Sequence, residues 1–84
     1  MKILKFYATW CGPCKMQTEY LKNITGADII EINVEEDEND DLVSKHKVRS
    51  LPKLVIMDDS DEVVKEFVGL TPAEKIQEII NERI

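Results

Sequence analysis

The stretch Trp10–Lys15, WCGPCK, decides how this sequence is interpreted. It holds Cys11 and Cys14, the only two cysteines among the 84 residues of the chain, with two residues between them. Two thiols at this spacing can form a redox pair, half of a metal site or a structural bridge. The rest of the sequence bears on which of the three applies.

A structural bridge and a metal site both find little support. A disulfide that closes so short a loop constrains the unfolded chain very little. In the cytoplasm, where we expect this chain, thiol pools keep structural disulfides reduced. Zinc needs about four ligands, and His46 is the only histidine, so a metal site would need a second chain. The redox pair is therefore the preferred interpretation.

Composition limits the class of protein. The chain carries 17 acidic and 11 basic residues, a net charge of −6, which argues against a nucleic-acid or anionic-membrane binder, because both need a basic face. The apolar runs are too short to cross a bilayer. The stretch Met1–Tyr7 is too short for the apolar region of a secretory signal. We therefore expect a single domain over residues 1–84, located in the cytoplasm and without a membrane partner.

Hydrophobic periodicity predicts four strands and three helices. Strands are expected at residues 3–7, 29–34, 53–57 and 62–68. Helices are expected between Pro13 and Gly26, over Asp41–Lys47, and onward from a capping box at Thr71–Glu74. Long helical crossovers join parallel strands and a tight turn joins antiparallel ones. The order β-α-β-α-β-β-α thus predicts an α/β fold with a mixed sheet flanked by helices.

Several side chains are assigned structural roles only. We expect His46 to be a surface or half-buried residue of the short helix, and the acidic run Glu35–Asp41 to be a solvated loop that leads into that helix. The expected core positions are Phe6, Met16, Leu54, Ile56, Phe67 and Ile80.

The cysteine motif lies where the first predicted strand ends and the first helix begins. Backbone N–H groups and the helix dipole at such a position stabilise a thiolate, so the pKa of Cys11 should be lowered. Cys14 lies one helical turn further in. The pair is therefore suited to a reaction in which Cys11 attacks a disulfide and Cys14 resolves the mixed disulfide.

The motif WCGPCK resembles the active-site motif of the thioredoxin family. The resemblance extends to Ser50–Pro52 before a strand and to Phe67–Leu70 before the last helix, and it covers nearly the whole chain. The chain is similar to compact archaeal and phage members that lack the N-terminal strand and helix. The resemblance implies the thioredoxin fold and a protein disulfide reductase. Such a protein needs no bound cofactor and is itself reduced by a thioredoxin reductase or a similar electron donor. The sequence leaves the oligomeric state open, and we take a monomer as the default.

The resemblance also implies roles for individual residues. Cys11 would be the exposed nucleophile and Cys14 the resolving cysteine, while Gly12 and Pro13 set the turn between them. Pro52 matches the cis-proline that faces the cysteine pair in the family. Four positions would contact the substrate beside that turn: Trp10, Leu51, Pro52 and Gly69.

Two charged positions depart from the family pattern. Thioredoxins usually carry a buried Asp six residues before the first cysteine and a Lys on the next strand, where this chain has Lys5 and Glu31. We expect these two side chains to form a partly buried ion pair beneath Cys14, with Glu31 taking over proton transfer, because Cys14 must lose a proton before it attacks. Alternatively, both extend to water and have no catalytic role.

Other functions remain open alongside the disulfide reductase. A glutaredoxin-like or isomerase-like oxidoreductase would differ in reduction potential and in its dependence on glutathione. A thioredoxin-fold binding module with incidental redox activity belongs to a different class of protein. Its function would survive the substitutions Cys11→Ser and Cys14→Ser.

Overall fold

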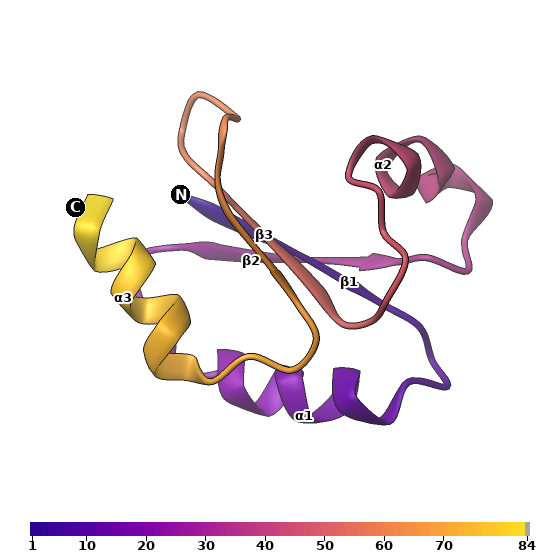
Figure 1. Cartoon of the computed structure of the whole chain (residues 1–84), viewed down its shortest axis with the longest axis horizontal. Coiled ribbons are helices and arrows are strands. Elements are labelled where there is room, and N and C mark those ends of the chain that lie inside the picture. Colours follow the sequence, from indigo (N-terminus) through magenta and orange to yellow (C-terminus); the bar gives the residue numbers. More distant parts are fainter. Residues whose placement is uncertain (84) are drawn as a thin grey trace.

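A four-stranded mixed sheet with the strand order β2-β1-β3-β4 organises the chain. The computed structural model describes residues 1–83. In it β1 pairs parallel with β2 and antiparallel with β3, and β3 pairs antiparallel with β4. The strands, seen in Figure 1, are β1 (Lys2–Tyr7), β2 (Asp28–Asn33), β3 (Lys53–Met57) and β4 (Val63–Val68). The predicted order and strand directions are confirmed.

Helices cover both faces of this sheet, with α1 and α3 on one side and α2 on the other (Figure 1). They are α1 (Gly12–Leu21), a short 3-10 helix η1 (Asp37–Asn39), α2 (Asp40–Lys45) and α3 (Ala73–Arg83). The acidic run Glu35–Asp41 is largely exposed, as expected, but it is not only a loop, because it includes η1 and the first two residues of α2. No helix within residues 1–83 has the length and apolar character needed to cross a bilayer.

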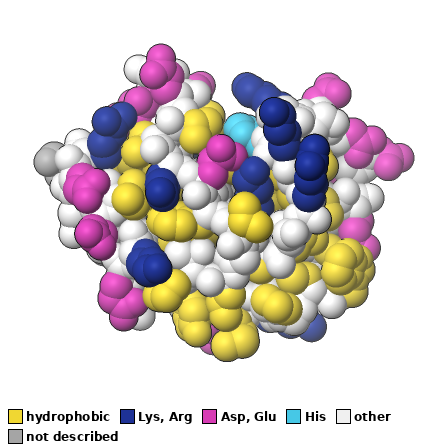
Figure 2. Space-filling model, viewed as in Figure 1, with side chains coloured by type: hydrophobic (Ala, Val, Ile, Leu, Met, Phe, Trp, Pro, Cys, Tyr) yellow, Lys and Arg dark blue, Asp and Glu magenta, His cyan; other side chains and the backbone are white. Residues whose placement is uncertain are grey.

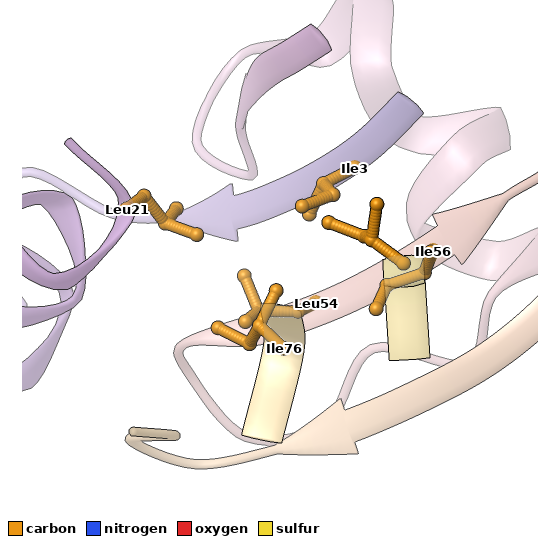
Figure 3. Packing of buried hydrophobic residues seen from close by; sticks show 6 residues of the cluster. Ile3, Leu21, Leu54, Ile56 and Ile76 are labelled. Carbon is orange, nitrogen blue, oxygen red and sulfur yellow. The ribbon is translucent and has the colours of Figure 1, made fainter. Parts of the chain in front are cut away.

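Each face of the sheet carries its own hydrophobic core. Successive residues of a strand point to opposite faces, so the short apolar runs of β1 and β3 contribute to both. Figure 3 shows the core between the sheet and the helices α1 and α3; its labelled residues are Ile3, Leu21, Leu54, Ile56 and Ile76. Under α2 the second core contains Leu4, Phe6, Ile32, Val55 and Met57. Because β3 is central and covered on both faces, all of its residues are buried.

The core prediction is wrong at one position. Met16 is 50% exposed, whereas the neighbouring Gln17 is completely buried. The helix begins at Gly12, so its buried stripe runs through Cys14, Gln17 and Leu21, which places Met16 on the outer face. The other predicted core positions are confirmed. Phe67 is partly buried, and four positions are fully buried: Phe6, Leu54, Ile56 and Ile80.

His46 is also placed differently from the prediction. It is 6% exposed, and its ring centroid lies 5.7 Å from that of Phe6. The residue caps the C-terminus of α2, where its backbone N–H donates to the carbonyl of Leu42 and the chain turns back over the sheet. Burial lowers the pKa of His46, and the nearby positive charges of Lys45 and Lys53 contribute to the same effect.

Candidate active site

A disulfide joins Cys11 and Cys14 at the N-terminus of α1. Cys11 is the N-cap residue, and its Sγ accepts a hydrogen bond from the backbone N–H of Cys14 at 3.2 Å. Pro13 lies in the first turn, where its missing N–H costs no helical hydrogen bond. The sulfur of Cys11 thus lies where free N–H groups and the helix dipole favour a thiolate.

Both sulfurs are covered in this oxidised form. Cys11 is 5% and Cys14 is 2% exposed, and the pair packs with Ala8, Tyr7 and Leu51. The expectation that Cys11 is exposed is therefore wrong for the disulfide state, because its sulfur is bonded to Cys14 and covered by these apolar neighbours. Position at the N-cap, not exposure, distinguishes the two cysteines here.

The peptide bond between Leu51 and Pro52 is cis, as the family resemblance implied. Leu51 packs against the cysteines, and the carbonyl of Pro52 accepts a hydrogen bond of 2.8 Å from the N–H of Gly69. This bond brings the turn after β4 beside the cis-proline. Gly69 has φ of +87°, a left-handed conformation that favours glycine, although a Cβ there would meet no atom within 4 Å.

Apolar side chains are exposed around this junction. Trp10 is 72% exposed, and Val68 and Leu70, on either side of Gly69, are 65% and 39% exposed. Gly12 is exposed as well, and a Cβ built on it would meet nothing within 4 Å. In Figure 2, hydrophobic side chains gather on the lower half of the face, where the end of β4 and helix α1 lie in Figure 1. Such an apolar surface beside a disulfide is suited to contact with another polypeptide.

Gln17 supports the site and was missed in the sequence. Its Nε2 donates to the carbonyl of Thr71 at 3.0 Å, and its Oε1 accepts from the N–H of Thr71 at 2.8 Å. The hydroxyl of Thr71 donates to the carbonyl of Gly69 at 3.0 Å, whereas we expected it to cap α3. Gln17 therefore fixes the turn at Gly69 to α1. Nothing in the sequence distinguishes Gln17 from a surface glutamine, so its burial could not be predicted.

Lys5 and Glu31 form the predicted ion pair. They are register partners on β1 and β2, and Nζ of Lys5 lies 3.3 Å from Oε1 of Glu31. The pair is asymmetric, because the side chain of Lys5 is 3% exposed and that of Glu31 is 47% exposed. Nζ also lies 5.3 Å from the centroid of the Tyr7 ring, a favourable position for a cation–π contact.

Thr18 links this ion pair to the cysteines. Its Oγ1 accepts a hydrogen bond from Nζ of Lys5 and donates one to the carbonyl oxygen of Cys14 at 3.2 Å. A pocket of about 310 Å³ lies beneath the motif, and its lining includes Lys5, Cys14, Thr18 and Glu31. Nothing in the sequence distinguishes Thr18 from other surface threonines, because its two partners are fixed only by the packing of α1 on β1.

Glu35, a member of the acidic run, holds the segment before the motif. Its Oε1 accepts hydrogen bonds from both the N–H and the hydroxyl of Thr9, each at 2.8 Å. These bonds lower the pKa of the Glu35 carboxyl. The expectation of a solvated acid therefore omits a structural role, because Glu35 ties the loop that carries Trp10 to the end of β2.

Comparisons with known proteins agree with this geometry. The model of the thioredoxin family matches residues 1–82. The thioredoxins of Staphylococcus epidermidis and Staphylococcus haemolyticus are each 37% identical to the chain over 89 residues, with 100% of this chain and 83% of theirs covered. A mutant thioredoxin from Halobacterium salinarum superposes with a TM-score of 0.80 at 37% identity, which covers 96% of this chain and 72% of that one. A malaria-parasite thioredoxin-2 has a TM-score of 0.83 at 19% identity, a likeness of fold alone.

Proposed function

The chain belongs to the thioredoxin family and is a thiol-disulfide oxidoreductase that reduces protein disulfides, and on this premise we propose the role of each residue. The observation that carries the proposal is the Cys11–Cys14 pair at the N-terminus of α1, beside the cis peptide of Pro52. In the reduced protein, the same N-cap position would present Cys11 as a stabilised thiolate.

The proposed reaction proceeds through a mixed disulfide. The Cys11 thiolate attacks one sulfur of the substrate disulfide, that S–S bond breaks, and the other substrate sulfur leaves as a thiolate that takes up a proton. Cys14 then loses its proton and attacks Sγ of Cys11, which breaks the mixed disulfide and releases the second substrate thiolate. The substrate has gained two electrons, and the Cys11–Cys14 disulfide has formed.

We propose Glu31 as the group that accepts the proton of Cys14. Glu31 and Cys14 line one pocket, so a proton can pass between them through water. The buried ammonium group of Lys5 supports the proposal in a second way, since its ion pair holds Glu31 at this pocket and its positive charge favours a thiolate at Cys14. Lys5 is therefore proposed as a positioning residue that holds Glu31 and stabilises the charge on Cys14.

The substrate segment is proposed to lie in extended form against Leu51 and Pro52. Trp10 would supply an apolar contact, and Gly12 and Gly69 would let the substrate backbone approach closely, because neither has a side chain that obstructs it. Pro13 keeps the motif in its turn. This arrangement offers backbone groups to the main chain of the substrate, a contact that does not depend on its side chains.

We further propose that residues 1–84 act as one domain, as a monomer in the cytoplasm, with electrons supplied by a thioredoxin reductase or a similar donor. All four strands of residues 1–83 belong to one sheet, which supports the single domain. The relatives are called thioredoxins, which supports this kind of electron donor.

The function is tested by measuring the reduction potential of the Cys11–Cys14 couple. Equilibration against thiol buffers can be followed by the fluorescence of Trp10, the only tryptophan, which adjoins Cys11. We expect a potential well below that of the glutathione pool. A value at or above that pool would instead favour a glutaredoxin-like or isomerase-like role. Function that persists in the Cys11→Ser and Cys14→Ser variants would indicate a binding module.

A further inference from the structure

A basic surface adjoins Leu51 and Pro52, where the substrate is proposed to lie. Residues 45–53 contain four of the eleven Lys and Arg residues and no Asp or Glu, in a chain whose net charge is −6. Lys45, Lys47 and Arg49 are exposed, and none of the three forms a salt bridge within residues 1–83. We call these three side chains the basic segment.

The basic segment borders a hollow on the same face as the apolar surface. In Figure 2, dark-blue side chains gather around the cyan His46, above the hydrophobic band. The pocket here has a volume of about 300 Å³ and is lined by Lys45, His46, Lys47, Lys53, Val63 and Glu66. Its one carboxylate is already neutralised, because Oε1 of Glu66 lies 3.0 Å from Nζ of Lys53. The remaining charge around the hollow is positive.

The basic segment continues directly into the cis-proline turn. Arg49 precedes Leu51 by two residues, so their Cα atoms are separated by at most about 7 Å. Leu51 in turn packs against Cys11 and Cys14. A polypeptide that reaches the disulfide along Leu51 and Pro52 would therefore come within reach of the Arg49 side chain.

The conformation of Lys47 is an independent observation. Lys47 has φ of +51°, the left-handed region. It follows the C-cap of α2 in a Schellman motif, in which the N–H of Val48 donates to Val43 and that of Lys47 donates to Ser44. Glycine is the usual residue there because a Cβ is unfavourable. Lys45 complements the dipole of α2, but helix stability does not explain a lysine at position 47.

We propose that the basic segment selects substrate proteins in which acidic residues flank the disulfide. The inference rests on the proposed function, since it requires the substrate to lie along Leu51 and Pro52. Asp or Glu side chains on the α2 side of that substrate would pair with Arg49, Lys47 and Lys45. The overall negative charge of the protein does not prevent this, because exposed charges are screened beyond about 8 Å at physiological ionic strength and the local cations dominate.

Two disulfide peptides of identical length test the proposal, one with Asp and Glu around the cysteines and the other with Ser and Gln. Exposed ion pairs are individually weak, so we expect kcat/KM to favour the acidic peptide by about three- to tenfold at physiological ionic strength. The preference should vanish near about 0.5 M NaCl, where screening is strong. Equal values for the two peptides at physiological ionic strength would overturn the proposal.

Variants separate the local charge from the total charge. The double variant Lys47→Gly, Arg49→Gln should lose most of the preference, and Lys47→Gly should leave the thermal midpoint unchanged or raised, because glycine is favoured at that φ. Lys75→Gln is the control for total charge, since Lys75 is exposed on α3 and its substitution removes one positive charge, as each substitution in the double variant does. An unchanged preference in the double variant, or the same loss in Lys75→Gln, would overturn the proposal.

Failure of this inference is distinguishable from failure of the function. Hydroxyethyl disulfide is small and uncharged, so its reduction by the wild-type protein depends on the cysteines and not on the basic segment. If the protein reduces this compound but does not distinguish the two peptides, only the selectivity is wrong. If the protein reduces neither the compound nor the peptides, the disulfide reductase itself is wrong.

Discussion

Lys5 and Glu31 face each other across the parallel pair β1–β2, with Nζ 3.3 Å from Oε1. The positive member is buried and the negative member is half exposed to the pocket under Cys14. The asymmetry assigns different tasks to the two side chains. Lys5 supplies a fixed charge that water cannot screen well, whereas Glu31 can exchange protons with water.

Glu31→Gln should slow the resolution of the mixed disulfide. The amide keeps the size of the side chain but cannot accept a proton, and the loss of a positioned general base costs about a hundredfold or more. Because the substitution leaves the buried ammonium group of Lys5 without its charged partner, we expect the free energy of unfolding to fall by about 1–3 kcal/mol. Single-turnover kinetics of a preformed mixed disulfide at Cys11 measure the rate directly.

Glu78→Gln on α3 is the matched control, because it removes the same charge far from the motif in the sequence. An unchanged rate of resolution in Glu31→Gln would show that the carboxylate has no part in the proton transfer. The attack of Cys11 on the substrate precedes this step, so its rate should change less than the rate of resolution does.

Thr18→Val should destabilise the protein and change the pH dependence of the resolution step. Valine has a similar shape but leaves Nζ of Lys5, which is buried, without one of its hydrogen-bond partners. A buried polar group that loses a partner costs about 1–3 kcal/mol. Urea denaturation measures the loss of stability. The pH dependence of the resolution step is measured as well, because in the wild-type protein the Thr18 hydroxyl donates to the carbonyl of Cys14.

Thr18→Ser provides the rescue, since serine retains the hydroxyl. We expect Ser to restore the pH profile even if the missing methyl group lowers stability. If Val and Ser change the pH profile equally, Thr18 acts through packing alone, and the link from Lys5 to Cys14 has no functional consequence.

Gln17→Leu should destabilise far more than Met16→Ala, although the sequence places the apolar residue at position 16. Leucine at position 17 leaves the N–H and the carbonyl of Thr71 without partners inside the protein, at a cost of about 1–3 kcal/mol for each buried group. Met16 is 50% exposed, and surface substitutions stay within about 0.5 kcal/mol. Chemical denaturation of the two variants gives the comparison, and equal losses would contradict the burial of Gln17.

These residues mark the limit of what the sequence predicts. Alternating apolar residues and the WCGPCK motif predicted the sheet, the helices and the N-cap position of Cys11, because those features depend on neighbours in sequence. The cis peptide at Pro52 came only from the family resemblance, since an X-Pro bond is cis in about 5–6% of cases. Gln17, whose partner Thr71 lies 54 residues away, was missed because that contact forms only when α1 packs on the loop.

The Lys5–Glu31 pair was predictable because both positions could be compared with a family pattern. Lys53 offered no such comparison. It stands at the start of a strand, where an exposed lysine is ordinary, yet it is 7% exposed and its Nζ donates to the carbonyl of His46. The sequence contains both residues, but the turn that places one over the other is a property of the folded chain.

His46 should titrate below the ordinary histidine pKa, and the protein should lose stability as the pH falls through that region. Burial against Phe6 lowers the pKa of His46 from 6.5, and Lys45 and Lys53 add to the effect against the opposing charge of Glu66. The unfolded chain therefore takes up the proton first. Stability is fully present above about pH 6.5 and is lost as the pH falls toward the folded pKa.

The ring resonances of His46 report its pKa directly, because it is the only histidine. Thermal midpoints measured between about pH 5 and 7.5 report the stability, in a range where side-chain carboxylates contribute little. His46→Phe keeps an aromatic ring over Phe6 but cannot take up a proton, so its midpoint should vary less across this range than that of the wild type. A pKa at or above 6.5, or the same pH dependence in His46→Phe, would contradict a buried neutral imidazole.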